Sequence, residues 1–289
     1  PHPARQNHMA GKRLTVPWAS RETGLPGRFW AACRVAEKLP AHYNMGRWES
    51  RPVCEPAGRI GQVGIFRSFG VPKPDGAACP AVTAIVVAAG RSERMGFDKQ
   101  MLRLGDVPVL ARTLSVFEQS RTVSRVIVVT RTTGIPAVAS MIREFGFTKA
   151  GHIVGGGATR QRSVSIGLKL AADADYIAIH DGARPLVTPE CVDRVARTAF
   201  RVGAAAAAVP VRDTVKRTED DGRVVSTPTR RNLWLVQTPQ IFEAGLYRRA
   251  IARAEEDGAD YTDDCQLVES IGGQVQLVEG EYFNLKLTR

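Results

Sequence analysis

From residue 81 onward, short apolar runs alternate with longer amphipathic stretches. Val82–Ala88 is a β-branched run that ends just before Gly90, which is typical of a buried parallel strand leading into a loop. The pattern predicts further strands at Arg125–Thr130, His152–Val154, Tyr176–His180 and Ala204–Val209, and helices at Val107–Gln119, Ile135–Phe145, Gln161–Ala172 and Pro189–Val202. This alternation predicts an α/β fold with a doubly wound, mostly parallel sheet, whose ligands sit at the carboxyl ends of the strands.

Residues 211–235 interrupt this alternation. Two short β-like pieces, Thr214–Thr218 and Arg223–Ser226, flank the sequence Glu-Asp-Asp-Gly at 219–222. Asp-Gly between β-branched runs is a strong hairpin signal. We therefore expect an arm that leaves the sheet, and arms of this kind often pair with a second subunit.

Residues 1–80 show neither the strand period nor the helix period. They hold ten of the 17 prolines, and their 12 Lys and Arg against 5 Asp and Glu supply +7 of the chain's net charge of +11. A charged segment broken by proline is predicted to be irregular or disordered, and a reading frame extended upstream of the true start would look the same. The folded domain is therefore expected at 81–289, which carries only +4.

Composition excludes several classes of protein. No apolar run approaches the ~18 residues that a membrane-spanning helix needs. The five cysteines lie far apart without C-x-x-C spacing, which argues against a zinc module or a disulfide scaffold and favours the reducing cytoplasm. The basic segment raises nucleic-acid binding as a hypothesis, but its aromatic residues have no predicted fold to hold them, which argues against it: Trp18, Phe29, Trp30 and Trp48.

The loop after the first strand carries the first candidate chemistry. Ala88, Ala89 and Gly90 are small enough for the backbone to approach a ligand closely, and free N–H groups there could hold phosphates. Arg94 and Lys99 add two cations beside this loop. The sequence is neither G-x-G-x-x-G nor a Walker A motif, so an ordinary glycine turn with surface charges is the alternative.

Two further strand ends carry candidate residues. Gly155–Gly157 precede a helix with Ser163 in its first turns, which suits a loop wrapped around a flat ligand, although a plain flexible connection is the alternative. Asp181 ends a buried strand, where a carboxylate can hold a divalent metal, with Mg²⁺ favoured beside phosphates. The alternative for Asp181 is a helix or turn cap, and His180 is more often a satisfied structural histidine than a base or ligand.

The remaining candidates are scattered and, taken one by one, are typical of surface or turn residues. They are Asp213–Thr214, Arg230, Thr238–Gln240, Thr262–Asp264 and Asn284–Arg289. Asp263 and Asp264 could simply cap a helix that runs through Glu269.

Taken together and in this order, these segments resemble the 2-C-methyl-D-erythritol 4-phosphate cytidylyltransferases. The resemblance covers 81–289 and none of 1–80. It is carried by Ala88–Met95 with Lys99, Gly155–Ser163, His180–Pro185, Pro210–Thr214, Gln237–Gln240 and Asn284–Thr288. It implies a Rossmann-like nucleotidyltransferase fold and the transfer of CMP from CTP to methylerythritol phosphate, with release of pyrophosphate, in non-mevalonate isoprenoid synthesis.

The resemblance also implies a role for each matching residue. The positions that match the CTP pocket are Ala88, Ala89, Gly90, Gly155, Gly156, Ser163, Asp181 and Gly182, with Asp181 beside Mg²⁺. The catalytic positions are Arg94, Lys99, Arg230 and Lys286, and the positions that contact the second substrate are Arg184, Thr214, Thr238 and Thr262. In the family, the arm reaches the partner's site, so a homodimer with shared active sites is implied.

The chain departs from the family pattern in three places. Asp98 stands where the family usually has proline, either Arg230 or Arg231 could meet the substrate, with spacing favouring Arg230, and the chain stops at Arg289 where the family usually continues into a C-terminal helix. A fragment, or the first half of a fusion with a cyclodiphosphate synthase, would look like this. A ribitol-phosphate cytidylyltransferase shares most of the motifs, and a member that has lost its activity is a further alternative.

Overall fold

The centre of the fold is a seven-stranded sheet with the strand order β11-β7-β10-β6-β1-β4-β5. The computed structural model describes residues 80–90 and 100–287. The strands are β1 (Val82–Val87), β4 (Val123–Thr130), β5 (His152–Gly155), β6 (Tyr176–Asp181), β7 (Ala204–Pro210), β10 (Trp234–Glu243) and β11 (Gln276–Glu279). Strand β10 runs antiparallel to both of its neighbours, while the other pairings are parallel. The predicted doubly wound, mostly parallel sheet is confirmed.

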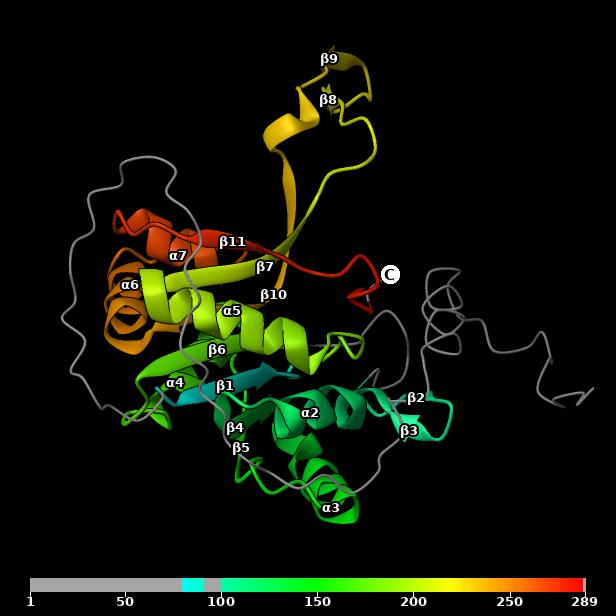
Figure 1. Ribbon diagram of the computed structural model, residues 1–289, viewed down its shortest axis with the longest axis vertical. Helices are drawn as coiled ribbons and strands as arrows, with labels where there is room; N and C mark the ends of the chain where they lie inside the picture. Colours follow the sequence, from blue (N-terminus) through cyan, green and yellow to red (C-terminus); the bar gives the residue numbers. More distant parts are fainter. Residues whose placement is uncertain (1–79, 91–99, 288–289) are drawn as a thin grey trace, which may run out of the picture.

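Helices cover both faces of this sheet (Figure 1). One face carries α2 (Val109–Gln119), α3 (Ile135–Phe145) and α5 (Pro189–Val202), and the other carries α4 (Arg160–Lys169), α6 (Ala244–Glu256) and α7 (Asp264–Ser270). Successive strand residues alternate between the two cores, so Val86 packs in the first and Ile85 in the second. Among the described residues, no helix combines the length and apolarity that crossing a membrane requires.

The ends of several elements follow local sequence signals. α3 and α5 have the predicted bounds, because a proline lies in the first turn of each helix and a glycine follows its last residue. α2 begins at Val109 rather than at the predicted Val107, because Val107–Pro108 forms β3 and pairs with β2 (Arg103–Leu104). A short 3-10 turn, η2 (Thr132–Gly134), leads from β4 into α3.

The arm projects from the body between β7 and β10 and is drawn in yellow in Figure 1. Its strands β8 (Arg217–Thr218) and β9 (Val224–Ser226) pair as an antiparallel hairpin, and η3 (Arg230–Asn232) leads back to the sheet. At the turn, Gly222 has a φ of 84°, a conformation that favours glycine. The hairpin predicted from the Asp-Gly pair is therefore confirmed.

The two cysteines that the structure describes lie in the core. Cys191 and Cys265 are buried with free thiols, and burial raises the pKa of Cys191 to about 12. Both thiols are therefore protonated near neutral pH. Cys33, Cys54 and Cys79 lie outside the described residues, as does the predicted basic segment up to residue 79.

Candidate active site

The carboxyl ends of four strands meet at one edge of the sheet. Val87 of β1 lies beside Asp181 of β6, and Thr130 of β4 lies beside Gly155 of β5. Main-chain hydrogen bonds fix the first residue beyond three of these strands: Ala88 N–H donates to Val129 O at 2.7 Å, Gly156 N–H to Thr130 O at 2.7 Å, and Gly182 N–H to Val87 O at 2.9 Å. The three loops that the sequence analysis singled out therefore begin side by side.

Gly156 packs against two other residues of the predicted CTP pocket. A β-carbon at Gly156 would come within 2.3 Å of Ala89 Cβ and 2.8 Å of Ser163 Oγ, so only glycine fits there. The Ser163 hydroxyl accepts from Gly157 N–H at 3.1 Å and donates to the Thr159 carbonyl at 2.9 Å. These contacts form a wall made largely of backbone, which we call the glycine wall (Ala89, Gly156 and Ser163).

Asp181 lies at the centre of a cluster of cations, which we call the Asp181 cluster. Its Oδ2 accepts from Arg184 Nε at 3.2 Å and from Lys286 Nζ at 3.0 Å, and its Oδ1 accepts from Arg160 Nε at 3.3 Å. The aspartate is buried, whereas Lys286 is exposed. Three cations on one carboxylate leave this edge positively charged, which suits a phosphate.

The charges of the cluster fix the protonation states of its members. Burial alone would raise the pKa of Asp181, but the charges of Lys286, Arg160 and Arg184 outweigh that effect and hold the pKa well below its usual range. Burial alone would lower the pKa of Arg160, but the charges of Asp264 and Asp181 raise it above its usual value. Asp181 is therefore a fixed negative charge near neutral pH, rather than the turn cap considered from sequence.

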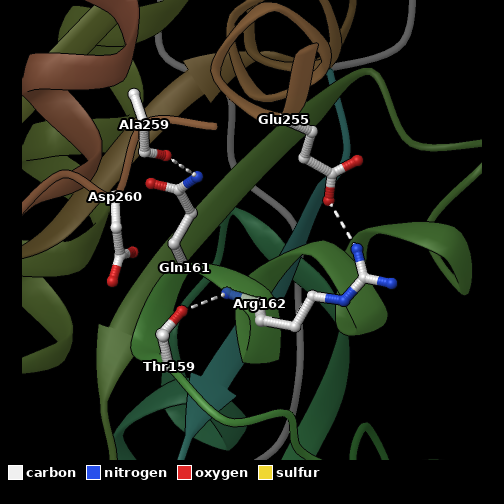
Figure 2. A pocket seen from close by; sticks show the side chains of 6 residues that line it. All are labelled: Thr159, Gln161, Arg162, Glu255, Ala259 and Asp260. Atoms are coloured by element: carbon white, nitrogen blue, oxygen red, sulfur yellow. Dashed lines mark hydrogen bonds and ion pairs between the residues drawn. The ribbon is translucent and has the colours of Figure 1, made fainter. Parts of the chain in front are cut away.

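Arg160 is a member of this cluster that the sequence analysis did not single out. It is the first residue of α4 and follows Thr159, whose hydroxyl caps the helix by accepting from Arg162 N–H (Figure 2). Arg160 Nη1 lies 2.6 Å from Asp264 Oδ2, and Asp264 Oδ1 accepts from the Tyr247 hydroxyl at 2.6 Å. The position of Arg160 at the start of a helix, after a glycine-rich loop, was a sequence signal for a ligand-binding residue. Its partner Asp264 lies too far along the chain to be predicted.

Gln161 ties the start of α4 to the segment that leads into α7. Its side-chain amide donates to the Ala259 carbonyl at 2.9 Å and accepts from Tyr261 N–H at 3.0 Å. The next residue, Arg162, points outward to Glu255 at 2.9 Å (Figure 2). These two hydrogen bonds join the start of α4 to the residues before α7, and so support the ion pair between Arg160 and Asp264.

His180 and Thr238 support Asp181 from the buried side. His180 Nδ1 lies 3.0 Å from Thr238 Oγ1, and Nε2 lies 3.2 Å from the Arg184 carbonyl oxygen. Because a carbonyl only accepts, Nε2 carries the proton and Nδ1 accepts from Thr238. Thr238 Oγ1 in turn accepts from Asp181 N–H at 3.2 Å. Burial lowers the pKa of His180 to about 4, and its satisfied nitrogens are those expected of a structural histidine.

The segment after β11 places Lys286. Asn284 is fully buried, and its Nδ2 donates to the Thr238 carbonyl at 2.9 Å. Its own carbonyl accepts from Arg184 Nη1 at 2.8 Å. These bonds fix the main chain at Asn284, two residues before Lys286. The Lys286 ammonium is therefore placed where it contacts the Asp181 carboxylate.

The other predicted site residues lie apart from this cluster. Thr214 and Arg230 are exposed on the arm, where Arg230 donates to the Arg212 carbonyl. The Thr262 hydroxyl donates to Gln266 Oε1 at 3.0 Å at the start of α7. The cap of that helix is Asp263, as expected, whereas its neighbour Asp264 makes the buried ion pair. Arg94 and Lys99 lie outside the described residues.

Comparison with known proteins assigns these features to a family. The family model for 2-C-methyl-D-erythritol 4-phosphate cytidylyltransferase matches residues 82–289. A protein of that name from Geobacter metallireducens is 46% identical over 215 residues, which are 72% of this chain and 92% of the relative. The chain belongs to this cytidylyltransferase family.

Solved structures agree with this assignment. The crystal structure of the cytidylyltransferase from Thermus thermophilus is 34% identical, with a TM-score of 0.60 over 71% of this chain and 92% of that one. The bifunctional IspDF from Campylobacter jejuni is 29% identical, with a TM-score of 0.59 over 72% of this chain and 52% of that one. The resemblance and the Rossmann-like nucleotidyltransferase fold are therefore confirmed, and the chain is a cytidylyltransferase by family.

The donor set of this cytidylyltransferase fits Mg²⁺ only together with a phosphate ligand. Within residues 80–90 and 100–287, no three His, Cys, Asp or Glu side chains gather into a group that could hold a metal ion. Asp181 is the predicted ligand, and it is a single carboxylate at the edge of the sheet. Mg²⁺ is commonly held by one or two carboxylates plus the phosphates of a nucleotide, so Asp181 would hold the ion only together with the phosphates of CTP.

Proposed function

We propose that this cytidylyltransferase transfers CMP from CTP to 2-C-methyl-D-erythritol 4-phosphate at the Asp181 cluster. A phosphate oxygen of the acceptor attacks the α-phosphorus of CTP, and the bond from that phosphorus to pyrophosphate breaks. The products are 4-diphosphocytidyl-2-C-methyl-D-erythritol, for non-mevalonate isoprenoid synthesis, and pyrophosphate. The observation that carries this proposal is the group of three cations around Asp181, next to the glycine wall.

CTP is assigned to the glycine wall and the loops beside it. The pocket comprises Ala88, Ala89, Gly90, Gly155, Gly156, Ser163 and Gly182, with Asp181 at its border. The close approach of Gly156 to Ala89 leaves a narrow wall of backbone. A wall of this kind accepts the flat pyrimidine ring more readily than a larger purine.

The cations are assigned to the two phosphate-bearing substrates. Phosphoryl transfers need little covalent help from protein, and depend on bringing two anions together and on stabilising the negative charge that spreads in the transition state. Arg184 and Lys286 already point at one oxygen of Asp181 and are available to the acceptor phosphate. Arg94 and Lys99 are assigned to the transition state by their match to the family motif.

Mg²⁺ is assigned to Asp181 and the triphosphate of CTP. The ion supplies positive charge that neutralises the phosphates. The protein's part is to present an ionised carboxylate, and the low pKa of Asp181 keeps that carboxylate charged.

The arm is assigned to a homodimer with shared active sites. Large apolar side chains are exposed along it and on the adjoining part of β10, with exposed fractions between 38% and 58%: Val224, Val225, Trp234, Leu235 and Val236. An exposed apolar row on a projecting arm is typical of a protein–protein contact. The partner subunit's Thr214 and Arg230 then complete the acceptor site, to which Thr238 and Thr262 are also assigned.

Two further assignments follow from the cysteines and the family. We assign the enzyme to the cytoplasm, because both described cysteines are free thiols. A fusion to a downstream cyclodiphosphate synthase remains a prediction. The match to only 52% of the bifunctional Campylobacter jejuni chain is compatible with such an arrangement.

One assay tests the proposed reaction. The full chain is supplied with CTP, Mg²⁺ and either methylerythritol phosphate or ribitol 5-phosphate, and pyrophosphate release is measured. We expect release with methylerythritol phosphate. Release with ribitol 5-phosphate alone would show that the acceptor is the other polyol phosphate, and release with neither would contradict the proposed function.

A further inference from the structure

Four residues form a closed ring of hydrogen bonds behind the Asp181 cluster, in which each side chain donates to the next residue and three of the acceptors are main-chain carbonyls. Its bonds run from Thr238 Oγ1 to His180 Nδ1 at 3.0 Å, from His180 Nε2 to the Arg184 carbonyl at 3.2 Å, from Arg184 Nη1 to the Asn284 carbonyl at 2.8 Å, and from Asn284 Nδ2 to the Thr238 carbonyl at 2.9 Å. We call this the Asn284 ring. It joins three pieces of chain that are far apart in the sequence: the end of β6 with the turn that follows it, β10, and the segment after β11.

Three of the four residues of the Asn284 ring are buried. His180 and Asn284 are fully buried, and Thr238 is 3% exposed. Phe117 packs edge-on to the imidazole, with ring centroids 5.0 Å apart. Buried polar groups are costly when they lack partners, so the four bonds of the ring favour one arrangement of these segments. Asn284 Oδ1 is the one side-chain atom of the ring that is buried without a hydrogen-bond partner.

Two buried members of the ring, His180 and Asn284, hold the cations that share Asp181 Oδ2. His180 fixes the main chain of Arg184, and Asn284 fixes the guanidinium of Arg184 through its carbonyl. Asn284 also stands two residues before Lys286. The result is that Arg184 Nε and Lys286 Nζ both lie within 3.2 Å of the same oxygen, Asp181 Oδ2. Neither His180 nor Asn284 makes a hydrogen bond with the Asp181 carboxylate itself.

We propose that His180 and Asn284 are positioning residues for the acceptor phosphate, acting through Arg184 and Lys286. This inference rests on the proposed function, because it concerns how the acceptor is held. No residue of the glycine wall belongs to the ring, and the ring touches the CTP pocket only where Thr238 accepts from Asp181 N–H, so CTP binding is expected to depend on the ring much less than acceptor binding does. A merely structural ring would instead stabilise the fold without favouring one substrate over the other.

His180→Asn is the first test. The shorter amide keeps an acceptor near Thr238 but cannot reach the Arg184 carbonyl, so Arg184 loses a restraint. We expect kcat/KM for the acceptor to fall about 10-fold, the effect of one lost positioning hydrogen bond, while the Kd of CTP changes less than about twofold. His180→Gln is expected to recover part of the loss, because its amide N–H reaches as far as Nε2.

Ser120→Ala is the matched control for lost stability. Ser120 is 1% exposed and donates to Asp193 Oδ1 at 2.6 Å, at the opposite end of the sheet from the ring. The variant removes the bonds of this hydroxyl to Asp193, Val123 N–H and the Thr122 hydroxyl, so it is expected to lower Tm at least as much as His180→Asn. Its kinetic constants for both substrates are expected to stay within about twofold of the starting values.

A double-mutant cycle decides whether His180 acts through Arg184. In an Arg184→Gln background, His180→Asn is expected to lower acceptor kcat/KM less than about threefold, because the group that it positions is gone. An equal loss in both backgrounds, or equal losses for CTP and the acceptor, would overturn the proposal. Should His180→Asn fail to fold, Asn284→Ala opens the ring at another bond and is taken through the same cycle.

The ring and the proposed function can fail separately. If the starting enzyme releases no pyrophosphate from either acceptor, the proposed function is wrong. The ring is then still tested by ¹⁵N spectra of the histidine-labelled chain. A neutral His180 protonated on Nε2 supports the ring, and protonation on Nδ1 overturns it.

Discussion

The strand edge around Asp181 and the arm differ in how deeply one chain buries their side chains. At the strand edge, Asp181, His180 and Asn284 are buried, and each has hydrogen-bond partners within the chain. On the arm, Thr214 and Arg230 are exposed. Both regions carry residues that match motifs of the family, but only those of the strand edge contact one another within one chain.

Under the proposed function, this difference separates the site into a part that one chain builds in advance and a part that the partner subunit would supply. Preorganised charges stabilise a transition state best, because they need no reorganisation during the reaction. The Asp181 cluster has this character. In the proposed homodimer, the arm of one subunit would reach the strand edge of the other.

The largest expected effect is the loss of the central charge of the strand edge. Asp181→Asn keeps the shape of the side chain but leaves three cations around a neutral amide, and removes the assigned ligand of Mg²⁺. We expect kcat/KM to fall about 10³-fold, a loss typical of one preorganised charged group. Steady-state kinetics on protein with an unchanged circular dichroism spectrum measure it, and a loss below about tenfold would contradict the central role of Asp181.

Ion pairs provide the second test of the comparison. Asp264→Asn breaks the 2.6 Å pair with Arg160, in which the aspartate side chain is 1% exposed. We expect the free energy of unfolding to fall by about 3 kcal/mol. Asp221→Asn on the arm breaks a 3.7 Å pair with Arg223, in which both side chains are more than half exposed, and is expected to change stability little. Urea denaturation measures both, and similar values would remove the distinction.

Acid is expected to act on the strand edge through His180. Its pKa is about 4 in the folded chain and near 6.5 when unfolded, so the unfolded chain binds more protons between these values. The stabilisation that depends on neutral His180 is therefore fully present above pH 6.5. As the pH drops to 4, the free energy of unfolding falls by about 3 kcal/mol. Asp181 contributes little in this window, because its pKa is lowered from an ordinary value that already lies at about 4, so its stabilisation is lost only at lower pH. Chemical denaturation of the wild type and of His180→Gln across this range should differ in slope, and parallel curves would contradict the assignment.

Substitutions of two glycines are expected to have the smallest effects. Gly156 is required because a side chain would clash, whereas Gly222 is favoured by its backbone conformation. Gly156→Ala places a methyl group 2.3 Å from Ala89 Cβ, so we expect a loss of about 1–3 kcal/mol in stability together with weaker CTP binding. Gly222→Ala meets open space but adopts a φ of 84°, which costs about 1 kcal/mol within the arm. Calorimetry with CTP should detect the first change and not the second.

Much of the fold was predictable because its signals are local. Proline and glycine mark the ends of α3 and α5, and the Asp-Gly pair marks the hairpin. Strand β10 was not predicted, because Thr238-Pro239-Gln240 resembles an interruption. The structure accommodates it as a shift of register against β7 between Val236 and Gln240.

The contacts of the site were less predictable because they join distant residues. The motifs marked Asp181, Arg184 and Lys286 one by one, but not their convergence on one carboxylate. Asn284 was expected at the surface or in a turn and is fully buried, because its amide and carbonyl find partners on other segments. No local pattern reveals such long-range bonds.

Mixing two inactive variants tests most directly whether the strand edge of one subunit works with the arm of the other. Asp181→Asn and Arg230→Ala chains are co-expressed and pyrophosphate release is measured. In shared sites, half of the dimers are mixed and each has one intact site, so we expect about a quarter of the wild-type activity to return. Activity no greater than the sum of the two separate variants would contradict the account.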